Sequence, residues 1–182
     1  GPTHSKASFT FTGTARKMWI LYVILTLLQS VLMCLGGMDV FDSVCHAMST
    51  MATGGFSTKS NSIAYWDSAY IQYVIIIFMF IAGINFGLVF TAIKGNWHKL
   101  IKDNEFQQYL LITIVASIII GIGLYASNWG SFEKSFRDAI FQVVTIITTT
   151  GFATADYLLW PPLLGLILFL LFFAGASAGS TA

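Results

Sequence analysis

The sequence predicts an all-α integral membrane protein made of two tandem parallel repeats, each consisting of a helix, a re-entrant pore loop and a second helix. Three observations predict it: an apolar composition, four uncharged stretches of membrane-spanning length, and a short glycine–phenylalanine segment within each pair of stretches. Of the 182 residues, 56% are hydrophobic and 9% are charged, and the mean hydropathy is +0.77. Because charged residues make up about 25% of a typical soluble domain, most of this surface must face lipid.

Each long stretch contains the roughly 20 apolar residues that a helix needs to cross a bilayer. The four are Met18–Met38, Ser68–Ile93, Phe106–Phe132 and Tyr157–Ala182. Two shorter uncharged stretches, Ser43–Thr58 and Ala139–Ala155, lie inside the first and second pair. A helix of about a dozen residues rises about 1.5 Å per residue, so it reaches only about halfway through the ~30 Å core. We therefore expect each to descend as a half-helix and return as irregular chain, which requires surrounding protein or a water-filled cavity.

The distribution of basic residues predicts the orientation of the chain. Three basic residues precede the first span, and three more lie between Lys94 and Lys102, whereas the two other loops carry most of the acidic residues. The positive-inside rule then places the N-terminus and the Lys94–Lys102 connection in the cytoplasm. Both re-entrant loops are expected to open from the outer face, where acidic side chains would concentrate cations.

An internal repeat gives the domain organisation. Sliding the chain by 96 residues superposes two loop segments, and an offset of 92 superposes Phe80–Gly87 on Phe172–Gly179. The matched pairs at 96 are Asp42 with Asp138, Ser49 with Thr145, Thr53 with Thr149, Gly55 with Gly151, Phe56 with Phe152, and Thr58 with Thr154. Each unit crosses the membrane twice, so the copies share one orientation. The expected divisions are 1–17 as a cytoplasmic segment, 18–93 as the first repeat, 94–105 as a cytoplasmic linker, and 106–182 as a second repeat truncated in its last helix.

The two loops have the composition of an ion-selectivity filter. Glycine tolerates positive φ, which lets successive carbonyls turn to one side, and rings of backbone carbonyls can replace the water shell of a cation. A half-helix that ends at the loop directs its partial negative charge there. Asp42 and Asp138 are expected to cap the other ends of the half-helices, and Phe56 and Phe152 to pack behind the loops. The expected filter residues are Thr53, Gly54, Gly55, Thr149, Thr150 and Gly151. The alternative is that each Gly-Phe marks a simple turn.

Two glycine-rich segments lie in the returning spans. Gly83 and Gly87 form a GxxxG pattern, for which tight helix packing is the expected role. The second copy continues as nine small residues, a poor helix by propensity, and is expected to form a local break that acts as a gate. The expected gate residues are Gly175, Ala176, Ser177, Ala178, Gly179, Ser180 and Thr181.

Other classes of function find little support. The net charge of +1 and the absence of a basic run give no sign of nucleic-acid binding. Cys34 and Cys45 form no CxxC pair and are expected to be buried thiols, and the scattered histidines predict no metal cluster. His46 is expected to pack or to form hydrogen bonds. Because the apolar stretches hold no carboxylate pair or nucleophile–base set, we expect no enzyme.

The sequence resembles the TrkH/KtrB/HKT superfamily of potassium transporters, and within it the TrkH family most closely. The likeness rests on Ala52–Thr58 (ATGGFST), Thr148–Thr154 (TTTGFAT) and Phe173–Ala182 (FAGASAGSTA), and it covers nearly the whole chain. Such proteins have four span–loop–span repeats in one polypeptide around a single pore, with one filter glycine per repeat and a gating loop in the third. By this resemblance the chain corresponds to the second and third repeats, and Gly55 and Gly151 to filter glycines.

The resemblance implies potassium uptake across the bacterial inner membrane, with potassium as the transported ion. It further implies a homodimer in the lipid bilayer and a cytosolic nucleotide-binding regulatory subunit of the TrkA/KtrA type. Two loops supply half a filter, so the chain should not conduct alone. The alternative is a cation-coupled carrier with alternating access around broken helices, for which Asn85 and hydroxyl groups are the available mid-membrane ligands.

Overall fold

The computed structural model describes residues 3–180, with side chains for residues 13–175. Within this range it is helical and contains no strand, as predicted. The elements are α1 (Thr3–Leu35), α2 (Val40–Met51), the 3₁₀ helix η1 (Ser62–Tyr65), α3 (Ala69–Ala82), α4 (Phe86–Ile93), α5 (Trp97–Lys102), α6 (Asn104–Ala126), α7 (Phe132–Ile147), the 3₁₀ helix η2 (Tyr157–Leu159) and α8 (Pro162–Ser180).

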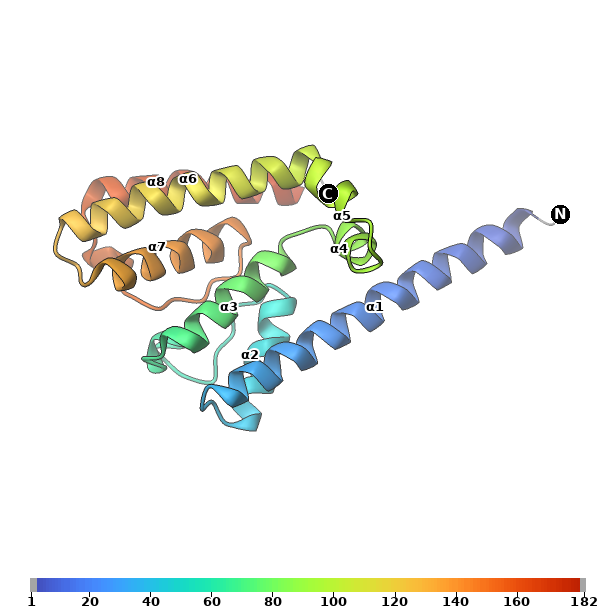
Figure 1. Ribbon diagram of the computed structural model, residues 1–182, viewed down its shortest axis with the longest axis horizontal. Helices are drawn as coiled ribbons and strands as arrows, with labels where there is room; N and C mark the ends of the chain where they lie inside the picture. The colour runs from blue at the N-terminus through green and yellow to red at the C-terminus, as the bar shows by residue number, and fades with distance from the viewer. Residues whose placement is uncertain (1–2, 181–182) are drawn as a thin grey trace.

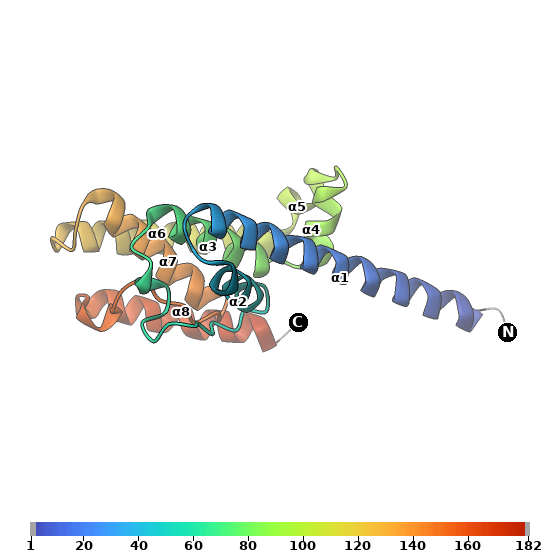
Figure 2. The same ribbon diagram turned by 90° about the horizontal axis from the view of Figure 1, so that it is seen from below.

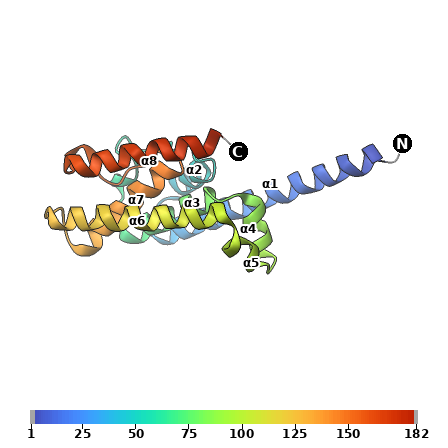
Figure 3. The same ribbon diagram turned by 90° about the horizontal axis from the view of Figure 1, so that it is seen from above.

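The helices form two units that pack against each other. In the first, α1 and α3 hold the short helix α2, and in the second, α6 and α8 lie on the two sides of α7 (Figures 1 and 3). The units meet where α7 packs against α3. Helix α1 extends beyond the rest of the molecule toward its N-terminal end, and α4 and α5 form an elbow at one side (Figure 2). Each short helix thus packs against the longer helices of its own unit, and the loops that follow the two short helices approach each other.

Apolar side chains from both units share one core. Met33, Ile75 and Met79 of the first unit are fully buried together with Phe141 and Phe152 of the second. A second cluster, which includes Ile120, Leu124, Val143, Leu164 and Leu168, joins α6, α7 and α8. Because each buried side chain of this size contributes about 1.5–3 kcal/mol, the shared core fixes the two loops relative to each other.

Two of the four expected spans are single helices that are long and apolar enough to cross a membrane, namely Gly13–Leu35 within α1 and Asn104–Ala126. The apolar part of α8 whose side chains are described, Pro162–Gly175, is shorter. Helix α7 begins at Phe132, seven residues before the expected start at Ala139, because the charged residues of its first turns pair with one another.

The expectation of one continuous span from Ser68 to Ile93 is wrong. Helix α3 ends at Ala82, α4 begins at Phe86, and their axes are bent by 107°. Gly83 caps the end of α3, and the Asn85 side chain accepts a hydrogen bond of 2.8 Å from the Gly87 amide to start α4. Gly83 and Gly87 therefore lie on opposite sides of a break, and the expected GxxxG packing face does not form.

The expected break in the second copy is also absent within the described residues. Helix α8 continues through Gly175 and Ala176–Ser180, while Thr181 lies outside the residues that the structure describes. Glycine in a helix costs only about 1 kcal/mol relative to alanine, the best helix former. The alternating alanines at 174, 176 and 178 therefore offset the glycines and serines, and the stretch stays helical.

Candidate functional site

Both half-helices end in the same capping motif. The Thr53 amide donates to the Thr50 carbonyl at 3.0 Å, and the Gly54 amide donates to the Ser49 carbonyl at 2.8 Å. In the second unit Thr149 and Thr150 donate in the same way, to Ile146 at 3.0 Å and to Thr145 at 2.8 Å. This pair of bonds is the Schellman motif, which satisfies carbonyls at a helix C-terminus. The two loops thus begin with one and the same backbone arrangement.

The residue after each helix cap is a threonine in the left-handed region. Thr53 has a φ of 50° and Thr149 a φ of 54°, where a glycine is usual. Gly55 and Gly151 follow two residues later, with φ of 70° and 96°. A branched side chain at positive φ costs about 1–2 kcal/mol, so the surrounding contacts must hold both threonines there. Four of the expected filter residues therefore have the positive φ that turns a short run of carbonyls.

Side chains of the half-helices hold the loops in place. Ser49 Oγ accepts from the Phe56 amide at 2.6 Å, and its counterpart Thr145 Oγ1 accepts from the Gly151 amide at 3.0 Å. These two hydroxyl groups were not among the expected site residues. Their signal in the sequence is that each falls on the other at the offset of 96, with its hydroxyl retained.

Two buried carboxylates brace the outer ends of the loops. Thr58 Oγ1 donates to Asp42 Oδ1 at 2.7 Å, and Thr154 Oγ1 donates to Asp138 Oδ1 at 3.0 Å. The expectation that Asp42 and Asp138 cap the half-helices is wrong, because Asp39 caps α2 and Ser131 caps α7. The carboxylates lie within the helices, so they face the returning chain instead of the first amides.

Each carboxylate also has a lysine beside it. Lys134 Nζ lies 2.7 Å from Asp138 Oδ2, which also accepts from Trp129 Nε1 at 2.9 Å. Lys59 Nζ lies 3.8 Å from Asp42 Oδ2. A carboxylate that is only 1% exposed, as Asp138 is, is stable when it is paired and hydrogen-bonded. Each pair of a carboxylate and a lysine therefore places nearly balanced charge behind its loop.

The structure brings the two loops into contact. A β-carbon built on Gly55 would overlap the carbonyl oxygen of Thr150, so only glycine permits this approach. Gly151 differs, because a β-carbon there would meet nothing within 4 Å. The expected filter residues of the two units are thus neighbours, and the carbonyl of Thr150 faces the backbone of the other loop.

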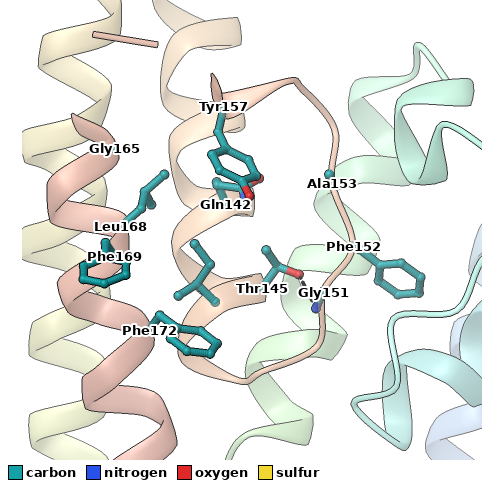
Figure 4. A pocket seen from close by; sticks show the side chains of 11 residues that line it. Gln142, Thr145, Gly151, Phe152, Ala153, Tyr157, Gly165, Leu168, Phe169 and Phe172 are labelled. Atoms are coloured by element: carbon teal, nitrogen blue, oxygen red, sulfur yellow. Dashed lines mark hydrogen bonds between the residues drawn. The ribbon is translucent and has the colours of Figure 1, made fainter. Parts of the chain in front are cut away.

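The two phenylalanines behave differently. Phe152 is fully buried and points away from α7 toward the first unit, as Figure 4 shows. There its ring centroid lies 5.8 Å from that of His46, whose Nε2 is 2.7 Å from Ser57 Oγ. His46 therefore packs and forms hydrogen bonds, as expected. Phe56 is 81% exposed, so the expectation that it packs behind its loop is wrong in this chain.

Two aligned glycines lie against the end of α7. A β-carbon on Gly175 would come 2.8 Å from the carbonyl oxygen of Ile147, and one on Gly83 would come 2.7 Å from Thr148 Cγ2. The first expected gate residue and the break between α3 and α4 therefore both touch the base of the second loop. Among the residues that the structure describes, no group of three or more His, Cys, Asp or Glu could hold a metal ion.

Comparisons with known proteins agree with this architecture. The family described as TrkH, cation transport protein, matches residues 9–182. The Trk system potassium uptake protein TrkH of Escherichia coli K12 is 38% identical over 170 residues, which is 92% of this chain and 35% of that protein. Its namesake in Halomonas elongata is 36% identical over 97% of this chain and 37% of that protein.

A solved structure gives the same result. The crystal structure of the potassium transporter TrkH from Vibrio parahaemolyticus aligns with a TM-score of 0.83 and 35% identity, covering 88% of this chain and 35% of that one. The chain thus spans about a third of the length of these relatives. With its apolar helices and this family match, the chain is a membrane protein, and it belongs to the TrkH family of cation transport proteins.

Proposed function

We propose that the whole protein takes up potassium across the bacterial inner membrane, through a filter of backbone carbonyls to which this chain contributes two loops. The expected ligands are the carbonyls of Thr53–Gly55 and Thr149–Gly151. Relatives named as Trk system potassium uptake proteins match nearly all of this chain. The protein is then a transporter and no enzyme, and potassium is its cargo.

The observation that carries the proposal is the contact between two loops of matching backbone. Each starts from the C-terminus of a short helix, where the helix dipole favours a cation, and each has positive φ at a threonine and a glycine. A dehydrated potassium ion needs several carbonyl oxygens at close range. Further repeats in the whole protein would complete the ring of oxygens.

The gate and the partners complete the proposal. We propose that Gly175–Thr181 regulates flux by bending or unwinding the end of α8, since Gly175 touches the carbonyl of Ile147 at the base of the filter. Dimerisation and a cytosolic nucleotide-binding subunit of the TrkA/KtrA type remain proposals that rest on family likeness. The alternative of a carrier has less support, because Asn85 Oδ1 already accepts from the Gly87 amide and keeps only one lone pair for an ion.

Substitution of the two filter glycines in the full-length protein tests the filter. Gly151→Ser places a side chain in open space, while Gly55→Ser forces the Thr150 carbonyl to move. Serine also disfavours the φ of 96° at Gly151, so each variant should shift the filter backbone, one by a collision and the other by strain. We expect both to lower the preference for rubidium over sodium in uptake assays by about tenfold or more, because displaced carbonyls no longer match the larger ion.

Gly37→Ser is the matched control. Gly37 also has a positive φ, 101°, and open space around its built β-carbon, but it lies in the turn after α1. It should carry the same backbone strain and leave ion preference unchanged. If Gly55→Ser and Gly151→Ser both fold and keep wild-type selectivity, the filter proposal is wrong.

A further inference from the structure

The bend between α3 and α4 brings basic residues from two distant parts of the chain together. Beyond the bend, α4 packs against α1, as Figures 1 and 2 show. The rings of Tyr22 on α1 and Phe86 on α4 meet edge to face, with 6.3 Å between their centroids. The turn of α1 that carries Lys17 therefore lies beside the elbow of α4 and α5.

Two lysines share one aromatic ring at this contact. Lys94 Nζ lies 4.8 Å from the ring centroid of Phe90, and Lys17 Nζ lies 5.8 Å from the same centroid. An aromatic face attracts an ammonium group at this distance, but the two like charges repel each other. Both lysines are exposed, so an anion from outside the chain can reach them and relieve the repulsion.

The basic residues at the elbow differ from those of the loops in having no carboxylate partner. Lys59, Lys134 and Arg137, in the loops, each form an ion pair. Within the described part of the chain, no ion pair involves the five residues that we call the basic elbow, namely Arg16, Lys17, Lys94, Lys99 and Lys102. The next acidic residues along the chain serve α6, since Asp103 caps it and Glu105 lies in its first turn. The chain therefore leaves the positive charge of the basic elbow without a counter-charge.

Exposed apolar side chains adjoin these charges. Ile93, at the end of α4, is 59% exposed, and Trp97 and Ile101 of α5 are each 57% exposed. Trp97 and Ile101 are four residues apart, so they lie on one face of α5. Because α4 is bent by 107° from α3, it runs close to the membrane plane when α3 crosses the membrane. Basic and aromatic side chains on helices in that plane are typical of surfaces that bind anionic headgroups.

We propose that the basic elbow binds an anionic phospholipid, with the phosphate near Lys17 and Lys94 and the acyl chains against the exposed apolar side chains of α4 and α5. A free phosphate would neutralise the lysines but leave Trp97 and its apolar neighbours in water. Helix α4 contains no charged residue and continues from a helix in the membrane, so a lipid reaches it more readily than a cytosolic protein does. The inference does not depend on the filter or on which ion is conducted.

A lipid titration of the full-length protein in a neutral detergent, followed by native mass spectrometry, tests the site. The probes are phosphatidylglycerol, which is anionic, and phosphatidylcholine with the same acyl chains, which is zwitterionic. Lys17→Gln and Lys94→Gln each remove one cation, and Lys94→Arg keeps it. Lys59→Gln is the matched control, because Lys59 also lies over a ring, that of Tyr65 at 4.5 Å, but pairs with Asp42.

We expect Lys17→Gln and Lys94→Gln each to weaken the binding of phosphatidylglycerol about fivefold, the usual contribution of one lysine near an anionic lipid. Lys94→Arg and Lys59→Gln should bind it like the wild type, and the binding of phosphatidylcholine should not change in any variant. Wild-type affinity for phosphatidylglycerol in both glutamine variants would overturn the proposal. Its displacement by an excess of inorganic phosphate would do the same, because the site would then take a free anion.

Photocrosslinking in cell membranes distinguishes a lipid from a protein at the same surface. Trp97 is replaced by p-benzoylphenylalanine, and Leu111 of α6, which is 61% exposed, serves as the control position. We expect the ratio of anionic to zwitterionic lipid adducts to be several times higher at position 97 than at position 111. An equal ratio, adducts with a protein in place of lipid, or no adduct at position 97 would each overturn the proposal. Neither experiment measures ion flux, so this inference and the proposed function can fail separately.

Discussion

At the scale of residues, the loops depend on hydroxyl groups that face buried charge. Asp138 accepts from Thr154, Trp129 and Lys134. A hydrogen bond to a charged group contributes about 1.5–3 kcal/mol, and the Thr154 bond is the only one of these three that reaches across to the returning loop. The stability of the second loop should therefore respond to this single hydroxyl.

Thr154→Val tests the hydrogen bond from Thr154 to Asp138. Valine keeps the shape of threonine but leaves one oxygen of Asp138 without its donor, so we expect the melting temperature of the detergent-solubilised full-length protein to fall by several degrees. Thr154→Ser, which retains the hydroxyl, should fall by less than half as much. Equal losses in the two variants would show that the methyl group, and not the hydrogen bond, stabilises the loop.

The positions of the two glycines could be predicted at this scale, but the left-handed threonines could not. Gly55 and Gly151 have the positive φ expected of them. Thr53 and Thr149 disfavour that conformation by themselves, and the tertiary contacts that hold them there are invisible in a single sequence. Phe152 and Phe56 make the same point, since the same sequence pattern gives a ring that is buried against His46 in one loop and a ring that is 81% exposed in the other.

At the scale of elements, the end of α7 lies between two helices that carry aligned glycines. Gly175 of α8 touches its last carbonyls, and Gly83, at the break after α3, touches Thr148. The break itself could have been predicted, because glycine followed two residues later by asparagine is a sequence of C-cap and N-cap residues. The break was not predicted because Ser68–Ile93 is apolar throughout. Hydropathy shows how long an apolar stretch is, but not whether the helix within it changes direction.

A double-mutant cycle tests the contact between the break and the second loop. In Gly83→Ala the new methyl group would lie 2.7 Å from Thr148 Cγ2 and 2.5 Å from Tyr109 Oη, and such overpacking costs about 1–3 kcal/mol. Thr148→Ser removes the methyl group but keeps the hydroxyl that donates to the Val144 carbonyl at 2.7 Å. We therefore expect the double variant to melt at a higher temperature than the sum of the single effects predicts.

Thr26→Ser provides the control cycle, because Thr26 makes the same kind of bond to its own helix, at 2.8 Å, on α1. Its effect should add to that of Gly83→Ala, as is usual for side chains without contact. Additivity in both cycles would contradict a direct contact between the break and the loop.

At the scale of the whole molecule, the outer surface of the long helices is apolar. Side chains such as Leu27, Val31, Ile119, Ile122 and Leu170 are each close to half exposed or more. Composition predicts this correctly, because it sums over residues and needs no contacts. The docking of the units on each other depends on contacts between distant segments. For that reason the packing of Phe152 against His46 could not be predicted from the sequence.

The distribution of charge predicts an orientation of the molecule in the membrane that can be measured. The elbow of α4 and α5 carries Lys94, Lys99 and Lys102, so we predict from the positive-inside rule that it lies in the cytoplasm. The turn between α6 and α7 is separated from it by the length of α6 and should face outward.

In a full-length protein without native cysteines, Ser127→Cys should react with a membrane-impermeant maleimide in intact spheroplasts. Asn96→Cys, at a position that is also exposed and with the lysines left in place, should react only after permeabilisation. The reverse pattern, or labelling of both from one side, would contradict this orientation and with it the entry of both loops from the outer face.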